Sequence, residues 1–301
     1  MRQLTVKGVR VDDTFAEAFG MRATALVITA DSLRWARQAA LTMTGYATSV
    51  IGCGAEAGVD REVPARATPD GRPGVRVLLF AVSTAELQKQ LQGRVGQCVL
   101  TSPGSACYAG LMGEESLKLG NALRFFADGW QIAKRFGGKR YWRIPVMDGE
   151  FVCEATTGLT KKAVGGGNLI IMGANAANTL RAAEAAVKAI DGVPDAIMPF
   201  PGGIARSGSK VGSKYKAPAS TNEFYCPTLR GAVKTELDVD INSVLEIVID
   251  GLTSESVAAA MRAGLAAIIK LGPKRGALRV GAGNYGGKLG PHHYHLKDLL
   301  P

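Results

Sequence analysis

One pattern of apolar and polar residues occurs twice along this chain. One window begins at Ala23 and another at Asn168. Each reads as an apolar strand, a polar cap, an amphipathic helix, a glycine and a strand that runs into a glycine-rich loop. The helix of the second window carries one apolar face, formed by Leu180, Ala183, Val187 and Ile190. The sequence therefore predicts an internal duplication.

A second pair of windows, which begin at Val75 and Val244, has the same order of strand and helix. The first helix is capped by Ser83 with Glu86, and the second by Thr253 or Ser254. Four apolar residues align on the second helix: Val257, Met261, Leu265 and Ile268. Each half is thus β-α-β followed by β-α-β, which is the ferredoxin-like pattern.

We therefore expect an α/β (α+β) protein of two tightly packed ferredoxin-like split βαβ lobes. The predicted lobes are residues 1–147 and 148–301. Asp148-Gly149 is a two-residue turn signal between apolar runs, so a hairpin is expected where the lobes meet.

The second lobe differs from the first by a long insertion, which we assign to residues 199–240. Its first part, PFPGGIARSGSKVGSK at 199–214, has no apolar period and continues through YKAPASTNEFYCPT to Thr228. Long ordered loops are often functional. Four cations lie among its glycines: Arg206, Lys210, Lys214 and Lys216. Glycine permits close approach of the backbone, and cations attract anions, so this loop is predicted to bind a negatively charged group.

Glu246 lies within the predicted strand Val244–Ile249, whose two faces are both apolar. A carboxyl group buried there would have a raised pKa and could act as a general acid or base. The alternative is a solvated Glu on an edge strand, or one paired with a lysine. The residues alone favour neither.

Three further stretches each have two interpretations. GAGNYGGKLG at 281–290 matches G-x-G-x-x-G, but no helix or acidic residue follows, so we interpret it as a tight loop with Lys288. Glu56, Asp60 and Arg61 in the stretch 53–74 line either a cleft or a solvated loop. The aromatic cluster RFFADGW at 124–130 could stack on a flat ring or form a subunit contact, but the core is the favoured location.

The composition is that of an ordinary globular protein, with 47% hydrophobic and 21% charged residues. The net charge of +10 is compatible with nucleic acid, yet the cations are dispersed and no basic helix is present. Small polyanionic substrates would be steered by the same field. We therefore predict no nucleic acid partner.

The cysteines and histidines provide no obvious metal site. Five dispersed cysteines form no CxxC pair, which argues against a disulfide framework and a thiolate metal site. The three histidines all fall in the last ten residues, where a polar strand is expected. The chain has no apolar run of membrane-spanning length and no secretory leader pattern, so we expect a cytoplasmic protein without membrane contact.

Several long motifs, taken together in order, resemble one family. They are DDTFAEAFGMRA at 12–23, TSVIGCGAEAGVD at 48–60, TPDGRPGV at 68–75, GQCVLTSP at 96–103, the insertion motifs at 199–214 and 218–228, and GAGNYGGKLG at 281–290. The chain resembles formylmethanofuran:tetrahydromethanopterin formyltransferase along its whole length. Because the chain is basic, whereas methanogen members tend to be acidic, the resemblance favours the bacterial, methylotroph-type branch.

The resemblance implies an enzyme that moves a formyl group between methanofuran and N5 of tetrahydromethanopterin. It implies no metal or tightly bound cofactor in the transfer, with both coenzymes as substrates. Implied partners are further copies in a homotetramer and the other subunits of a formyltransferase/hydrolase complex. A non-catalytic subunit that docks the carrier is the alternative.

The resemblance also assigns the site residues. Glu246 is the implied catalytic residue. The expected substrate-binding residues are Arg206, Ser207, Lys210, Lys214, Ser220, Thr221, Asn222, Glu56, Asn284 and Lys288. Cations on glycine-rich loops suit the carboxylate and phosphate tails of such coenzymes.

Overall fold

The computed structural model describes residues 3–113, 115–208 and 210–301, and its fold is a mixed α/β one, which confirms the predicted class. The chain divides into two compact units. One is Met21–Ala163, and the other combines Met1–Gly20 with Val164–Pro301. Each unit has its own apolar core. The predicted lobe boundary at 147/148 stays a prediction.

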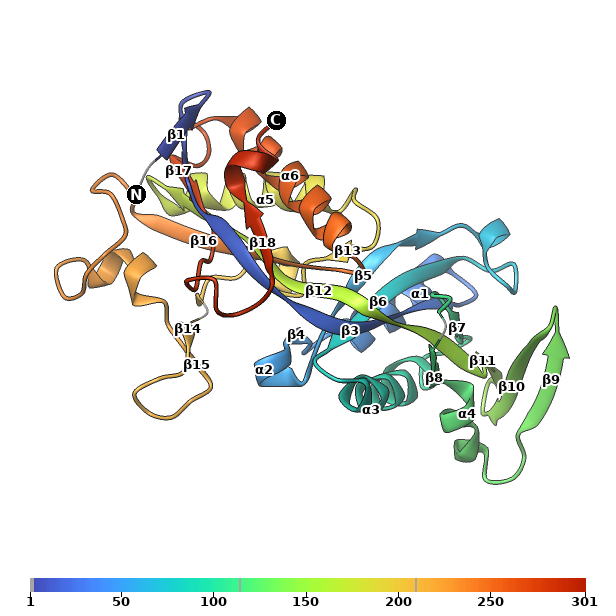
Figure 1. Cartoon of the computed structure of the whole chain (residues 1–301). Helices are drawn as coiled ribbons and strands as arrows, with labels where there is room; N and C mark the ends of the chain where they lie inside the picture. The colour runs from blue at the N-terminus through green and yellow to red at the C-terminus, as the bar shows by residue number, and fades with distance from the viewer. Residues whose placement is uncertain (1–2, 114, 209) are drawn as a thin grey trace. The chain divides into compact units, whose positions relative to one another are not determined.

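In the unit Met21–Ala163, antiparallel strands form the central part of the sheet, together with the longer helices α1 and α3 (Figure 1). Its elements in chain order are β3 (Phe15–Thr29), α1 (Leu33–Thr44), β5 (Ala55–Val63), β6 (Gly74–Ala81), α3 (Thr84–Arg94) and β7 (Ala106–Ala109). The strands lie in the order β5-β6-β3-β7. This is the split βαβ arrangement, because the strand that follows each helix does not pair with the strand before it.

The second unit repeats this arrangement. Its elements are β12 (Thr156–Gly173), α5 (Ala176–Ile190), β13 (Ala196–Ile197), β16 (Ser243–Gly251), α6 (Ser254–Leu271) and β17 (Arg279–Gly281). The strands lie in the order β13-β16-β12-β17, again with antiparallel neighbours. The internal duplication read from the sequence is therefore present in the strand order.

Each repeat also begins with a hairpin that extends the sheet of the other repeat. The first hairpin is β1 (Gln3–Val6) with β2 (Val9–Asp12), and β2 pairs in parallel with β17. The second is β10 (Lys139–Val146) with β11 (Gly149–Glu154), and β11 pairs in parallel with β7. The sequence analysis did not foresee this reciprocal exchange.

The remaining elements are short. Those of the first repeat are β4 (Thr48–Ser49), α2 (Val50–Cys53), η1 (Ala65–Ala67), η2 (Val95–Val99), β8 (Glu115–Lys118), α4 (Gly120–Leu123), η3 (Arg124–Ala127) and β9 (Ile132–Phe136). Those of the second are η4 (Pro201–Gly203), β14 (Lys210–Val211), β15 (Ala219–Ser220), η5 (Glu223–Tyr225), η6 (Pro227–Leu229), β18 (His292–His295) and η7 (Leu296–Leu299). No helix within the described ranges is long and apolar enough to cross a membrane.

The predicted caps begin the helices. The Ser83 hydroxyl accepts a hydrogen bond from Glu86 N–H, and Thr253 forms a capping box with Ser256. The predicted apolar face of α6 is buried in the core. On α5, Ala183 and Ile190 of the predicted face are buried and Val187 packs against the core, but Leu180 is 44% exposed. Ala182 and Ala186 are buried as well, so the buried face extends to one side of the predicted one.

Two local predictions need correction. The hairpin of β10 and β11 forms as expected, but Val146 pairs with Gly149, so the two turn residues are Met147 and Asp148. The aromatic cluster at 124–130 is not core. Three of its rings are largely exposed in the chain: Phe125, Phe126 and Trp130.

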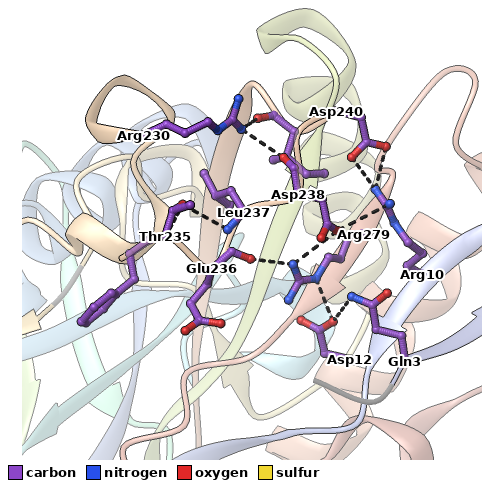
Figure 2. A network of polar contacts seen from close by, with 12 residues as sticks. Gln3, Arg10, Asp12, Arg230, Thr235, Glu236, Leu237, Asp238, Asp240 and Arg279 are labelled. Atoms are coloured by element: carbon purple, nitrogen blue, oxygen red, sulfur yellow. Dashed lines mark hydrogen bonds and ion pairs between the residues drawn. The ribbon is translucent and has the colours of Figure 1, made fainter. Parts of the chain in front are cut away.

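The insertion between β13 and β16 is tied to the sheet by arginines (Figure 2). Arg279 on β17 donates to Glu236 O at 2.7 Å and to Asp12 Oδ1 at 2.8 Å. Arg10 on β2 donates to both carboxylate oxygens of Asp240 at 2.9 Å. This part of the insertion has no regular secondary structure. Its position is fixed because the Glu236 carbonyl and the Asp240 carboxylate accept hydrogen bonds from arginines on the sheet.

Candidate functional site

Glu246 lies inside the sheet of its unit. It pairs with Ile170 on β12, and on the other side its backbone exchanges hydrogen bonds of 2.8 and 2.9 Å with Ala205. Its side chain is almost buried, with 8% of the residue exposed. The alternative of a solvated Glu on an edge strand is therefore wrong.

Asn168 joins Glu246 to the loop that follows β17. Its amide Nδ2 donates to Glu246 Oε1 at 2.9 Å, and its Oδ1 accepts from Gly283 N–H at 2.7 Å. Because the amide is used as donor and acceptor at once, its orientation is fixed by both partners. Asn168 thus sets the position of the Glu246 carboxyl.

Glu246 faces a cavity of about 370 Å³ within this unit. The predicted residues Lys210, Asn222 and Asn284 line the same cavity. Its remaining lining residues are Thr14, Ile170, Phe224, Tyr225, Glu236, Ala282, Gly283 and Tyr285. Apolar walls with a few convergent polar groups are typical of a small-molecule site.

A smaller hollow of about 40 Å³ also contacts Glu246. Arg206, Ser207 and Asn222 of the insertion line it, together with Val244 and Leu245 of β16. Asn222 and Glu246 are common to both spaces. The first part of the insertion therefore surrounds the strand carboxyl that the sequence analysis singled out.

Glu17 binds the backbone of the loop at 281–290 through its carboxylate. Its buried carboxylate accepts hydrogen bonds from the backbone N–H groups of Tyr285, Gly287, Leu289 and Gly290. Burial alone would raise the pKa of Glu17, but these N–H donors outweigh it and lower the pKa below its ordinary value. The carboxylate therefore stays ionised and holds the loop that carries Asn284 and Tyr285.

Two other groups of the cavity are electrostatically tuned. Burial and the negative charge of Asp12 raise the pKa of Tyr225 to about 12, against the effect of Arg279. Tyr225 is therefore a neutral hydroxyl at physiological pH. Lys210 forms an ion pair with Glu223, and this contact lowers the pKa of the Glu223 carboxyl. Lys210 is held at the cavity by a carboxylate from its own loop.

The other predicted residues are not among those that line these two spaces. Lys214 and Lys288 are exposed. Ser220 donates to Gly212 O at 2.7 Å within the β14-β15 hairpin, and Thr221 is exposed beside it. Glu56 belongs to the unit Met21–Ala163, where it accepts from Val50 N–H at 2.9 Å. In the part of the chain that the structure describes, no three His, Cys, Asp or Glu side chains gather as a metal site would require.

The sequence analysis missed Asn168, Glu17 and Tyr225. Asn168 could have been found, because it is an amide between GGG and LIIM in a strand expected to be buried. Glu17 likewise interrupts an apolar strand. Tyr225 had no such signal, since only the folding of the insertion brings its ring to the cavity.

Models of one family cover nearly the whole chain. The model described as formylmethanofuran-tetrahydromethanopterin formyltransferase matches residues 4–146, and the model described as FTR, proximal lobe, matches residues 149–299. The chain belongs to the formylmethanofuran-tetrahydromethanopterin formyltransferase family. This family membership confirms the resemblance inferred from the motifs.

Relatives agree along the full length. The formyltransferase of Methylococcus capsulatus is 58% identical over 298 residues, which cover 99% of this chain and 100% of the relative. A component of the formyltransferase/hydrolase complex of Methylorubrum extorquens is 56% identical over 306 residues, covering 100% of this chain and 98% of the relative. A crystal structure of that organism's complex with methylofuran contains a chain that superposes with a TM-score of 0.97 at 55% identity, covering 100% of this chain and 99% of that one.

Proposed function

We propose that this chain is an enzyme that transfers a formyl group between formylmethanofuran and N5 of tetrahydromethanopterin. One observation locates the proposed active site: the Glu246 carboxyl lies at the wall of a cavity of about 370 Å³ and accepts a hydrogen bond from Asn168. Membership of the formyltransferase family supplies the reaction class.

The reaction is an exchange of an amide between two amines. The lone pair of the pterin N5 attacks the formyl carbon and forms a C–N bond, and the carbonyl oxygen becomes an oxyanion. The C–N bond to the furan amine then breaks, the carbonyl re-forms, and the N5 proton ends on the leaving amine. A carboxyl beside the formyl carbon can carry that proton or donate a hydrogen bond to the oxyanion.

Glu246 is suited to this task in our proposal. Asn168 donates to one of its oxygens, Oε1. Both coenzymes bind together, so that proximity provides much of the acceleration without a covalent enzyme intermediate. No Ser or Cys nucleophile is used.

The polar residues that line the two spaces are proposed to bind the coenzymes. Arg206, Lys210 and Asn222 come from the insertion, and Asn284 from the loop after β17. Ser207 lines the smaller space. The exposed cations Lys214 and Lys288 would meet anionic tails outside the cavity. Ser220, Thr221 and Glu56 stay predictions of substrate contact.

The assembly of the protein is also a proposal. Its relative in Methylorubrum extorquens is a component of a formyltransferase/hydrolase complex. We infer that this chain forms a homotetramer that associates with further subunits of such a complex, in one-carbon metabolism of the formaldehyde-oxidising kind found in methylotrophs, and that it works in the cytoplasm.

A transfer assay with the isolated chain tests the proposed activity. The purified protein is mixed with formylmethanofuran and tetrahydromethanopterin, and the formation of formyl-tetrahydromethanopterin is followed. We expect multiple turnovers without any other subunit. A folded protein that binds both coenzymes but transfers no formyl group would overturn the enzyme assignment and leave the carrier-docking alternative.

A further inference from the structure

The unit Met21–Ala163 contains a second cavity, of about 390 Å³. It lies entirely within that unit and shares no residue with the spaces around Glu246. Its lining residues are Ala109, Leu111, Met112, Gly113, Ser116, Asn121, Gly138, Lys139, Arg140, Glu154, Ala155, Thr156, Thr157 and Gly158. The coenzyme site that we propose does not use it.

The internal duplication makes this cavity the counterpart of the Glu246 cavity. The helix caps Ser32 and Asn175 occupy equivalent positions, so Ile28 is equivalent to Ile171. Ile28 pairs with Cys107, and Ile171 pairs with Val280. Two residues further along these strands, Ala109 is therefore equivalent to Ala282.

The equivalence extends to the walls of both cavities. Cys153 pairs with Cys107 as Val11 pairs with Val280, which makes Thr156 equivalent to Thr14. Four equivalent pairs of residues line the two cavities: Ala109 and Ala282, Leu111 and Asn284, Met112 and Tyr285, and Thr156 and Thr14. The two cavities are thus one architectural feature that the duplication produced twice.

The second cavity lacks a counterpart of the Glu246 carboxyl. The helix caps Ser83 and Thr253 are equivalent, and the same offset makes Arg76 the counterpart of Glu246. Arg76 forms a buried ion pair with Asp60 at 2.5 Å and does not line the cavity. The second cavity therefore has no acid or base at the position that carries the chemistry in the first.

The charges of the second cavity favour an anion. Among the described residues that line it, the carboxylate is Glu154, which is nearly buried. It forms an ion pair with Lys139 Nζ at 2.9 Å and accepts a hydrogen bond from Ala109 N–H at 3.1 Å. Arg140 also lines the cavity, and its guanidinium has no ion-pair or hydrogen-bond partner among the described residues. A guanidinium without a partner is well suited to a planar carboxylate.

We propose that this cavity is a second ligand site, which binds a small organic carboxylate and does not catalyse formyl transfer. Arg140 binds the carboxylate, and the apolar residues Ala109, Leu111 and Met112 contact the hydrocarbon part of the ligand. The volume and these apolar residues favour an organic anion over inorganic phosphate, which has no apolar part to bury. This proposal goes beyond the proposed transfer activity.

Isothermal titration calorimetry of the full-length protein with acetate, butyrate and hexanoate tests the proposal. Each methylene that enters the cavity should strengthen binding about fourfold. Arg140→Ala should weaken hexanoate binding at least tenfold, and Arg140→Glu should abolish it. Arg135→Ala is the matched control. Arg135 is an exposed cation that lies opposite Arg140 in the register of β9 and β10, but it does not line the cavity.

The same titration of Glu246→Gln separates this site from the proposed coenzyme site. Hexanoate affinity should be unchanged in that variant, and no coenzyme is needed for the measurement. Circular dichroism of Arg140→Ala and Arg140→Glu establishes that both variants are folded. The proposal is overturned if hexanoate fails to bind at millimolar concentration, if phosphate binds as tightly as hexanoate, or if Arg140→Ala behaves like Arg135→Ala.

Discussion

Asn168 donates a hydrogen bond to Glu246 across two neighbouring strands, and its amide oxygen accepts from the backbone of the loop that follows β17. One buried side chain thus links the candidate catalytic carboxyl to the loop that lines its cavity. A displacement of the loop is expected to move the Glu246 carboxyl, and the reverse, because both hydrogen bonds fix the orientation of the Asn168 amide.

Replacement of Glu246 by Gln should remove the proton carrier and keep the shape of the side chain. We expect kcat for formyl transfer to fall about 10²–10⁴-fold, the usual contribution of general acid–base catalysis. The matched control is Glu236→Gln, since Glu236 lines the same cavity. If the control loses activity and Glu246→Gln does not, the catalytic role moves to Glu236.

Variants of Asn168 test the positioning of the carboxyl. Asn168→Ala should lower kcat about 10–100-fold, as loss of a supporting hydrogen bond commonly does in enzyme sites. Asn168→Asp places a second carboxylate beside Glu246, and repulsion between like charges should shift the pH–rate profile to higher pH. A purely structural role for Asn168 would lower thermal stability and leave the pH profile of the folded enzyme unchanged.

Glu17 should control the order of the loop at 285–290. In Glu17→Gln the charged acceptor is lost, so the amides of Tyr285, Gly287 and Leu289 should exchange hydrogen faster. Mass spectrometry of deuterium uptake measures this directly. Amides on α6 should keep their wild-type exchange rates in the same experiment.

The pH dependence of that loop follows from the lowered pKa of Glu17. A depressed folded-state pKa contributes stability above the unfolded value of about 4.3, and this contribution is lost as pH falls through the folded pKa. Protection of the loop amides should therefore persist at about pH 4.3 and disappear only in more acidic solution. Loss of protection between about pH 7 and about pH 5 would contradict the assignment.

The buried pair of Arg279 and Asp12 should dominate the stability of its unit. Both side chains are at most 3% exposed, and Arg279→Ala would leave the Asp12 carboxylate without its partner. Loss of one partner of a buried pair typically costs about 3–5 kcal/mol. Arg10→Ala, which removes a half-exposed pair with Asp240, should cost under about 1 kcal/mol. Urea unfolding of the two variants compares these costs.

The exposed rings of Phe126 and Trp130 are candidates for the contact between copies. The double variant Phe126→Ser, Trp130→Ser should reduce the molar mass measured by light scattering below that of the proposed tetramer, because both rings lose apolar contact area. Tyr46→Ser, which changes another largely exposed aromatic ring of the same unit, is the control. An unchanged mass in the double variant would place the contact elsewhere.

The sequence was sufficient for the repeated β-α-β order, because strand and helix periods and the caps Ser83 and Thr253 are local properties. Glu246 could be singled out for the same reason, as a carboxyl within an apolar run. Its hydrogen bond with Asn168 depends on the register of two strands 78 residues apart in the chain, which no local pattern specifies. Phe125 and Phe126 were predicted to lie in the core but are exposed. Apolar character alone does not distinguish a core residue from an apolar residue on the surface.

The exchanged hairpins determine when each unit can be completed during synthesis. Met21–Ala163 is a continuous segment, so all of its strands are available once Ala163 has left the ribosome. The other unit contains β2 from the beginning of the chain, but its pairing partner β17 begins only at Arg279. β2 must therefore wait for β17, and the cavity around Glu246, which Ala282 and Tyr285 help to line, is closed only after these residues have been translated.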